Sequence, residues 1–272
     1  MTDPAQRRSR LRAALADRAR PALGTWVKIP ATESVELVSL AGFDFAVIDL
    51  EHSPIDLETA YRLIGTALHT GLSPVVRVAD LHPGLVQRVL DAGAEGLMVP
   101  HVDTPEQARA AAAAVRFPPL GTRGVGATSR AGAWGALPLA EYLRYGQEEV
   151  VLIAQIESAV GVANSGAIAA VPGVDALLVG AADLSVSEGT TPSDAGVRAL
   201  IASAVEQGRA AGLPVGNAGA ATAESVRTAL ADGFSFTMLS NDATLLGTAA
   251  RAAVETARTV TSGETPAEER TP

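Results

Sequence analysis

The chain has 272 residues, of which 47% are hydrophobic and 19% are charged, and its formal net charge is -9. Such a chain is long enough to bury one large core, and its negative charge with scattered basic residues argues against nucleic acid as a partner. Cysteine is absent, which excludes disulfides, thiolate metal ligands and a cysteine nucleophile. Lys28 is the only lysine, so a Schiff-base mechanism would have to use it.

The first 20 residues are predicted to form an arginine-rich, amphipathic helical extension outside the main repeat. Arg7, Arg8 and Arg10 are not followed by an apolar stretch of the kind found in signal peptides. No apolar run in the chain is long enough to span a bilayer. We therefore expect a cytoplasmic protein.

From residue 21 onward, apolar strand-like runs alternate with segments of helical periodicity. Asp56 and Thr104 stand where helices would start, and Gly71 and Gly93 stand where they would end. The expected strands are Leu23–Ile29, Phe43–Glu51, Pro74–Val78, Gly96–Val102, Val150–Glu157, Ala176–Leu184, Pro214–Asn217 and Phe234–Leu239. Eight such units predict a single-domain α/β fold, a (β/α)8 TIM barrel over residues 21–258. A doubly wound sheet is the alternative, but the glycine-rich first turn typical of it is missing.

Two further segments are expected to lie outside regular structure. Residues 117–145 would form a long irregular stretch, and loops of this length are usually functional or lie at an interface. Residues 259–272 are polar and rich in proline and glutamate, a composition typical of a disordered tail.

Polar residues follow most of the predicted strands. Because parallel strands place their carboxyl ends on one face of a barrel, these residues would share one mouth. The set comprises Glu51, His52, Arg77, His101, Glu157, Asp183, Asn217 and Ser240. Any one of them could simply solvate the barrel end, but several ionisable groups closing apolar runs indicate a site.

Glu157 and Asp183 are the candidate metal ligands. Each closes an apolar run, and two carboxylates facing one pocket repel each other unless a cation lies between them. Oxygen ligands favour Mg²⁺ or Mn²⁺ over zinc. The alternative is that each acid merely starts the next helix, where Ser158 and Ser185 also stand.

Asp49, His52 and Arg77 are the candidate catalytic residues. Asp49 could orient the imidazole of His52 and raise its basicity, which suits a general base near neutral pH. The alternative is a strand-end histidine satisfied by a loop carbonyl. Arg77 would bring a permanent cation to the mouth, suited to a carboxylate or a developing enolate, or it would pair with Glu51. Lys28 is more typical of a surface ion-pair partner than of an imine former.

Taken in order, short motifs across residues 20–250 make the chain resemble the HpcH/HpaI family of metal-dependent, class II pyruvate aldolases. The matching motifs are Gly24–Trp26, Ile48–His52, Val75–Arg77, Arg88–Ala94, Leu97–Pro100, Arg123–Gly126, Gln155–Glu157 and Ala182–Ser185. The resemblance implies a TIM barrel that assembles as a hexamer or trimer with an exchanged C-terminal helix.

The resemblance also implies roles for individual residues. A divalent ion (Mg²⁺, Mn²⁺ or Co²⁺) would lie on Glu157 and Asp183 and be chelated by pyruvate. Gln155 and the backbone at Ala182 and Asp183 would hold the substrate. His52 would move the proton, and Arg77 would stabilise the enolate charge.

The family's aspartate that raises the basicity of the histidine matches Asp91. Asp91 precedes the fourth strand, at the wrong end of its own barrel, so it would act from a neighbouring subunit or be only a loop acid. The chain departs from the family at Ala181, where proline is common, and at Glu188, where leucine is common. An extra negative charge at Glu188 would disfavour dianionic acceptor substrates.

The predicted function is a class II aldolase, an aldehyde-lyase of EC 4.1.2 type. It would reversibly cleave 4-hydroxy-2-oxo acids to pyruvate and an aldehyde through a metal-stabilised enolate. The alternatives are an oxaloacetate decarboxylase or a citryl- or malyl-thioester lyase that uses the same enolate. A non-catalytic oxo-acid sensor is disfavoured because His52 and Asp49 are both present. Small molecules, and no nucleic acid or membrane, are the expected partners besides copies of the chain itself.

Overall fold

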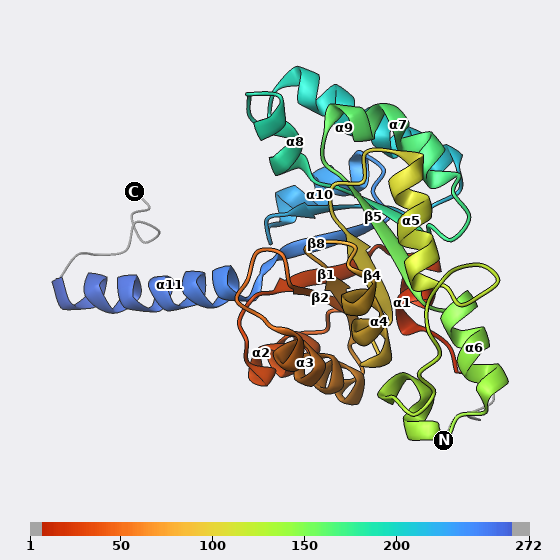
Figure 1. Ribbon diagram of the computed structural model, residues 1–272. Helices are drawn as coiled ribbons and strands as arrows, with labels where there is room; N and C mark the ends of the chain where they lie inside the picture. Colours follow the sequence, from red (N-terminus) through yellow and green to blue (C-terminus); the bar gives the residue numbers. More distant parts are fainter. Residues whose placement is uncertain (1–6, 263–272) are drawn as a thin grey trace.

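Eight parallel strands close into a barrel in the computed structural model, which describes residues 7–262 (Figure 1). The strands are β1 (Ala22–Val27), β2 (Phe45–Asp49), β3 (Ser73–Arg77), β4 (Gly96–Val99), β5 (Val151–Ile156), β6 (Ala176–Val179), β7 (Val215–Gly219) and β8 (Phe236–Asn241). Each strand pairs with the next in chain order, and β8 pairs with β1. The expected TIM barrel is therefore confirmed.

Most helices connect the strands and cover the outside of the barrel, whereas α1 precedes β1 and α11 follows β8. They are α1 (Arg10–Ala16), α2 (Thr32–Leu40), α3 (Leu57–Thr70), α4 (Pro83–Asp91), α5 (Pro105–Val115), α6 (Leu139–Glu148), α7 (Ala159–Ala169), α8 (Ala181–Ser187), α9 (Ala195–Ala210), α10 (Ala223–Ala231) and α11 (Asp242–Ser262), with a 3₁₀ segment η2 (Arg130–Gly135). The predicted start signals work as expected, since Asp56 accepts from Thr59 N and Thr104 forms a capping box with Gln107.

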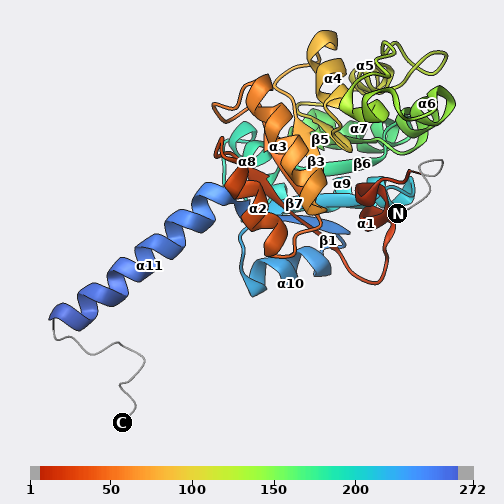
Figure 2. The ribbon, with the colours of Figure 1, turned by 90° about the horizontal axis from the view of Figure 1, so that it is seen from below.

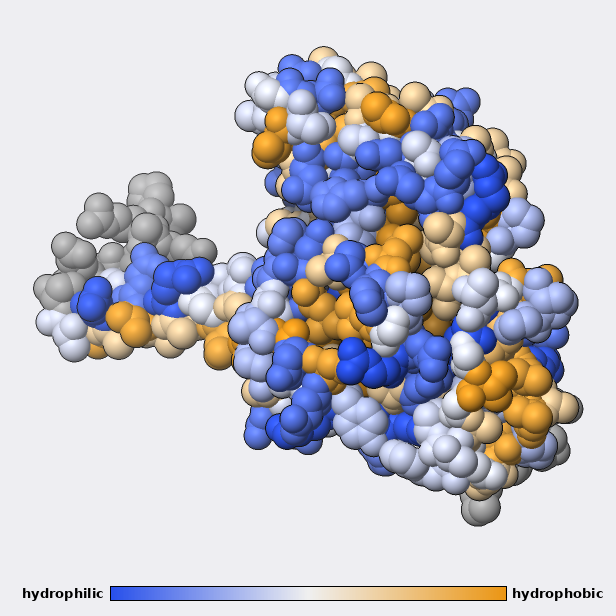
Figure 3. Space-filling view, viewed as in Figure 1, coloured by the Kyte–Doolittle hydropathy of each residue, from blue (hydrophilic) through white to orange (hydrophobic). Residues whose placement is uncertain are grey.

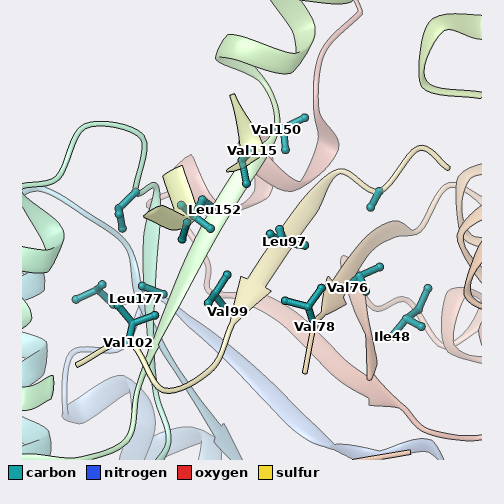
Figure 4. Packing of buried hydrophobic residues seen from close by; sticks show 14 of the residues in the cluster. Ile48, Val76, Val78, Leu97, Val99, Val102, Val115, Val150, Leu152 and Leu177 are labelled. Atoms are coloured by element: carbon teal, nitrogen blue, oxygen red, sulfur yellow. The ribbon is translucent and has the colours of Figure 1, made fainter. Parts of the chain in front are cut away.

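Alternation along the strands separates two apolar layers. The outward layer packs against the helices, and Figure 4 shows part of it, with Ile48, Val76 and Leu97 pointing to the same side of neighbouring strands. The inward layer fills the barrel, where Phe45 and Phe236 meet edge to face with ring centroids 6.1 Å apart. Gly24 faces the Phe45 ring. A Cβ at this position would lie 2.3 Å from the ring, so the interior has no room for a larger residue there.

The amino end of the barrel is plugged by the N-terminal segment. Helix α1 has only seven residues, and its Leu11 is fully buried among the inward-facing strand residues. The buried Glu95 carboxylate accepts from Ser9 Oγ at 3.2 Å and from Leu11 N at 3.1 Å. The predicted extension over residues 1–20 is thus shorter than expected and packs into the barrel. Residues 1–6 lie outside the described residues.

Three other expected boundaries are wrong. The sixth strand was expected to reach Leu184 but ends at Val179, because the chain turns at Gly180 into α8, where Leu184 N donates to Gly180 O. The stretch over residues 117–145 holds η2 and the first turns of α6. Residues 259–262 belong to α11 and not to a disordered tail, and residues 263–272 lie outside the described part.

Helix α11 leaves the barrel after β8 and projects away from the body in both views (Figures 1 and 2). It has 21 residues, and its side chains are almost all exposed. Within residues 7–262 no helix combines the length and the apolar character needed to cross a membrane.

Because Leu11 is fully buried beneath the barrel, Leu11→Ala is expected to lower the free energy of unfolding by about 2–5 kcal/mol. Denaturant unfolding followed by circular dichroism measures the change. The matched control is Leu37→Ala, because Leu37 is 67% exposed and its removal should cost less than about 0.5 kcal/mol. Equal effects of the two substitutions would show that α1 is not part of the cooperative core.

Candidate active site

A buried arginine–aspartate pair joins the carboxyl ends of β2 and β3. Asp49 and Arg77 are partners in the strand register, and both side chains point into the barrel mouth. Arg77 Nε and Nη2 donate to Asp49 Oδ1 and Oδ2 at 2.9 and 2.8 Å. The guanidinium also lies 4.1 Å above the Trp26 ring, and its Nη1 is 3.1 Å from Glu51 Oε2. Arg77 is therefore held on several sides, and its expected pairing with Glu51 is formed.

Asp49 is fully buried and neutralised by two cations. Lys28 Nζ lies 2.9 Å from Asp49 Oδ2, so the lysine is an ion-pair partner, although of a buried acid and not a surface one. Burial opposes ionisation of Asp49, but the bonds from Arg77 and Lys28 outweigh it and lower its pKa to about 2. Asp49 is thus ionised at neutral pH.

The predicted contact between Asp49 and the imidazole of His52 is not formed. Asp49 Oδ1 instead accepts the backbone N–H groups of Glu51 and His52, at 3.2 and 3.3 Å. The His52 ring is 57% exposed, and its Nε2 lies 3.8 Å from Glu51 Oε2. The reason is that Asp49 points into the barrel towards Arg77, whereas His52 lies past the end of β2. Asp49 therefore shapes the loop that carries His52.

Glu157 follows β5 directly and is buried in the mouth. Its Oε1 accepts from His101 N at 2.8 Å, and its Oε2 accepts from the Gln155 amide. Burial raises the pKa of Glu157, and the nearby Asp183 carboxylate adds to the rise, while the bonds from His101 and Gln155 oppose it. A cation at this place would relieve both the burial cost and the repulsion.

Asp183 reaches the site from a helix and not from a strand end. It lies in the first turn of α8 and is exposed. Gly180, one turn earlier, leaves space over the other acid, because a Cβ there would lie 3.0 Å from Glu157 Oε2. The backbone thereby keeps the region around the two carboxylates open.

The donor set around these acids fits a hard divalent ion. Glu157 and Asp183 supply carboxylate oxygens, and Gln155 Oε1 is buried without a hydrogen-bond partner among residues 7–262. That part of the chain contains no cluster of three His, Cys, Asp or Glu side chains with metal-ligand spacing. Mg²⁺ commonly uses one or two carboxylates and leaves its other positions to water and substrate, so two acids are sufficient.

His101 is a site residue to which sequence reasoning gave no role. It adopts a left-handed conformation with φ 54°, which ends β4 earlier than expected. Its Nδ1 lies 2.8 Å from Glu157 Oε1, and its Nε2 lies 3.3 Å from Glu51 Oε1. The ring is 65% exposed and bridges the two acids. No local sequence signal marks this conformation.

Two residues of the predicted mouth do not join this network. Asn217 shares the outward register of Val215 on β7, since alternate residues face the same side. Ser240 adopts φ 57° on β8, where its carbonyl accepts from Thr25 Oγ1 at 3.3 Å. Neither side chain has a described contact with the acids of the mouth.

Asp91 is the last residue of α4, and its described contacts are all with the segment between β4 and β5. Its Oδ1 accepts from Arg123 Nη2 at 2.8 Å and from Tyr142 Oη at 3.2 Å. A Cβ at Gly126 would lie 2.7 Å from Asp91 Oδ2, so only glycine leaves room for the carboxylate here. None of these contacts is with the mouth of the same barrel.

The family model described as HpcH/HpaI aldolase/citrate lyase matches residues 22–249. The chain belongs to this family. It is 40% identical over 229 residues to a 2-dehydro-3,6-dideoxy-6-sulfogluconate aldolase of Pseudomonas putida, covering 82% of this chain and 88% of that one. It is also 40% identical over 230 residues to a hydroxypyruvate/pyruvate aldolase of Chromohalobacter salexigens, covering 84% and 89%.

A solved family member supports the same assignment. The HpcH/HpaI aldolase/citrate lyase family protein from Burkholderia cenocepacia superposes with a TM-score of 0.85 and 36% identity, covering 91% of this chain and 98% of that one. The resemblance and the aldolase class expected from the sequence are thereby confirmed.

Replacing Asp49 by asparagine is expected to lower the free energy of unfolding at pH 7 by about 3–5 kcal/mol, because it leaves buried Arg77 without its anion. The folded-state pKa of about 2 lies below the reference value of 3.8, so this stabilisation is complete above pH 4 and is lost as the pH falls towards 2. Urea unfolding of both proteins across that range measures the difference. Asp232→Asn, on an exposed helix cap, is the control and should change little. A difference that stayed constant with pH would contradict this assignment.

Proposed function

We propose that this aldolase reversibly cleaves 4-hydroxy-2-oxo acids to pyruvate and an aldehyde, and that Glu157 and Asp183 hold its divalent ion. The observation that carries the proposal is the fixed guanidinium of Arg77 in the same mouth as the two acids. The relatives named as aldolases of pyruvate, of hydroxypyruvate and of a 2-keto-3-deoxy acid support this substrate class.

The metal would be Mg²⁺, Mn²⁺ or Co²⁺, all of which accept oxygen ligands. When bound, it supplies a Lewis acid that polarises the 2-oxo group of the substrate. Gln155 would bind substrate through its unpaired Oε1. The backbone N–H groups of Ala182 and Asp183 lie in the first turn of α8, where a helix has no acceptor of its own for them, so they would donate to the substrate carboxylate.

Arg77 would stabilise the negative charge that develops on the substrate oxygen as the carbon–carbon bond breaks. Its position is set before the substrate arrives, because Asp49 and Trp26 hold two sides of the guanidinium. Preorganised charge of this kind needs no rearrangement during the reaction.

In the cleavage direction, His52 would accept the proton of the 4-hydroxyl group as the carbon–carbon bond breaks and the aldehyde forms. It would then return a proton to the enolate carbon, which gives pyruvate. Its ring is exposed at the mouth and free to meet a substrate hydroxyl, and its backbone is anchored by Asp49. An imidazole can both accept and release a proton, which suits this role. Asp91 of a neighbouring subunit would raise its basicity.

The central test is pyruvate release from a 4-hydroxy-2-oxo acid before and after chelation, with metals added back singly and a parallel borohydride trap. We expect activity that dies with chelator, returns with Mn²⁺ or Mg²⁺ and resists borohydride. Chelator-resistant activity with labelling of Lys28 would overturn the proposal. Carbon dioxide release from oxaloacetate with no retro-aldol cleavage would favour the decarboxylase alternative.

Metal binding has a readout of its own. Glu157→Gln and Asp183→Asn should each weaken Mn²⁺ binding by more than about tenfold, because each removes one of two charged ligands. Isothermal titration calorimetry on metal-free protein measures this. Glu224→Gln, which alters an exposed acid at the start of α10, is the control and should bind as wild type. Unchanged affinity in both ligand variants would place the metal elsewhere.

Assembly into a hexamer or trimer would cover two surfaces that the single chain leaves open. Helix α11 exposes Leu246, Val254 and Val260, and Figure 3 shows apolar side chains along one edge of the projecting helix. The apolar face of a projecting amphipathic helix stays in contact with water unless another chain packs against it. An exchanged α11 would supply that contact.

Localisation in the cytoplasm stays a prediction from the sequence.

The second open surface lies beside Asp91. Figure 3 shows apolar side chains where η2 and α6 lie. Trp134 in η2 and Leu139 in α6 are exposed large side chains of these elements, at 65% and 55%. A neighbouring chain docked here would bring its own mouth towards the Asp91 carboxylate, whose side chain is 18% exposed. The composite site would then contain one chain's His52 and another chain's Asp91.

Mixing two inactive variants tests this sharing. Asp91→Asn and His52→Ala should each lose most activity, but their co-assembled mixture should recover part of it, because some interfaces then combine an intact His52 with an intact Asp91. Retro-aldol assays after joint refolding or co-expression measure the recovery. A mixture of two separately prepared His52→Ala samples is the control. No recovery in proven mixed oligomers would mean that Asp91 acts within its own chain or not at all.

A further inference from the structure

We propose that the amino end of the barrel carries a second binding site, for a small organic anion with two or more negative charges. A hollow of about 910 Å³ lies there, between α1 with its link to β1 on one side and the ends of α9 and α10 on the other. Figure 2 shows that link as a loop on the same side of the molecule as α10. The active site lies at the opposite end of the barrel and does not use this hollow.

The hollow is cationic in an otherwise acidic protein. Its ionisable lining comprises four arginines and two aspartates, namely Arg12, Arg18, Arg20, Arg209, Asp17 and Asp175. The chain as a whole carries a formal charge of -9. A local excess of positive charge inside a concave surface focuses the electrostatic potential on anions.

The two aspartates do not cancel that excess. Asp175 accepts from Arg12 Nη2 at 2.7 Å and from Arg116 Nη2 at 2.8 Å, so it is already shared by two cations. Asp17 Oδ1 accepts from the backbone N–H of Ala19 at 2.8 Å, and its Oδ2 lies 4.0 Å from Arg20 Nε. Neither carboxylate has a described contact with Arg18 or Arg209. Arg20 is also paired with Asp44 outside the lining, at 2.6 Å, so the uncompensated positive charge of the hollow comes from Arg18 and Arg209.

Among residues 7–262, the guanidinium groups of Arg18 and Arg209 form no hydrogen bond or ion pair, and both side chains are exposed. Arg209 Nη1 lies 2.6 Å from where a Cβ of Gly233 would stand, so its guanidinium rests against the turn before β8, on the wall of the hollow. A guanidinium presents a planar fork of N–H donors that matches a carboxylate or a phosphate. Two such forks from separate elements would grip a ligand with two anionic groups.

Apolar side chains complete the lining. Leu15, Leu213, Leu230 and Phe234 come from four separate parts of the chain and face the same space. Binding sites for organic molecules combine an apolar wall with a few convergent polar groups. The hollow therefore suits a carbon skeleton that carries its charges at the ends, such as a polycarboxylate or a phosphate ester, better than a bare inorganic ion.

Isothermal titration calorimetry with citrate and with glycerol 2-phosphate tests the proposal. Metal-free protein is used because citrate chelates divalent ions. We expect binding of at least one probe at one site per chain, weakened by about tenfold or more in the double variant Arg18→Gln/Arg209→Gln. Both side chains are exposed and unpaired, so the variant should fold normally, which circular dichroism verifies.

The control is Arg227→Gln/Arg251→Gln, which removes two exposed arginines outside the hollow and should leave affinity unchanged. Binding of citrate alone would identify a polycarboxylate site, and binding of the phosphate ester alone a phosphate site. No binding at millimolar concentration would overturn the proposal. If the Arg18/Arg209 variant keeps its full affinity, the anion binds elsewhere, in the mouth near Arg77. If the control variant loses as much affinity, the effect comes from net charge alone. Either result would overturn the proposal.

Discussion

A buried charge pair, Asp49 with Arg77, is the constraint on which the site depends. Removing two charges from water costs several kcal/mol for each ion, so such a pair persists only when hydrogen bonds satisfy both partners. Here Lys28 and two backbone N–H groups contact Asp49, while Arg77 also lies over the Trp26 ring and forms an ion pair with Glu51. The pair therefore fixes the ends of neighbouring strands and the loop that follows one of them.

From that pair a continuous network crosses the mouth. Arg77 contacts Glu51, Glu51 contacts His101, and His101 contacts Glu157. A continuous row of polar contacts therefore leads from β3 to the candidate metal ligand. Networks of this kind hold side chains more firmly than separate pairs because each member orients the next. The left-handed conformation of His101 belongs to the same arrangement, since it allows both the backbone N–H and the ring of one residue to reach Glu157.

The two ends of the barrel are chemically different. The carboxyl end presents acids around a fixed arginine, which suits a cation and an oxo acid together. The amino end is closed by Leu11, which Glu95 anchors through the backbone, and beside this plug lies the arginine-lined hollow. Because a barrel interior is packed with side chains and is not a pore, ligands at the two ends would not meet. The single chain also leaves α11 and the surface beside Asp91 uncovered, and these are the surfaces that the proposed assembly would cover.

The sequence by itself determined the barrel and most of the site's residue types. Eight apolar runs alternating with helical segments leave few packings other than a closed parallel barrel, and polar residues at strand ends must then share one mouth. Short motifs were enough to identify the family. Tertiary structure decided the partners of each side chain. Asp49 turned to Arg77 and not to the ring of His52, because the register of β2 and β3 sets residues 28 positions apart directly opposite. Asp183 lies in the first turn of α8 and not at a strand end. His101 reaches the site through a left-handed backbone conformation, which neither periodicity nor composition encodes. Such contacts depend on strand register and local φ, which a linear pattern of apolar and polar residues does not contain.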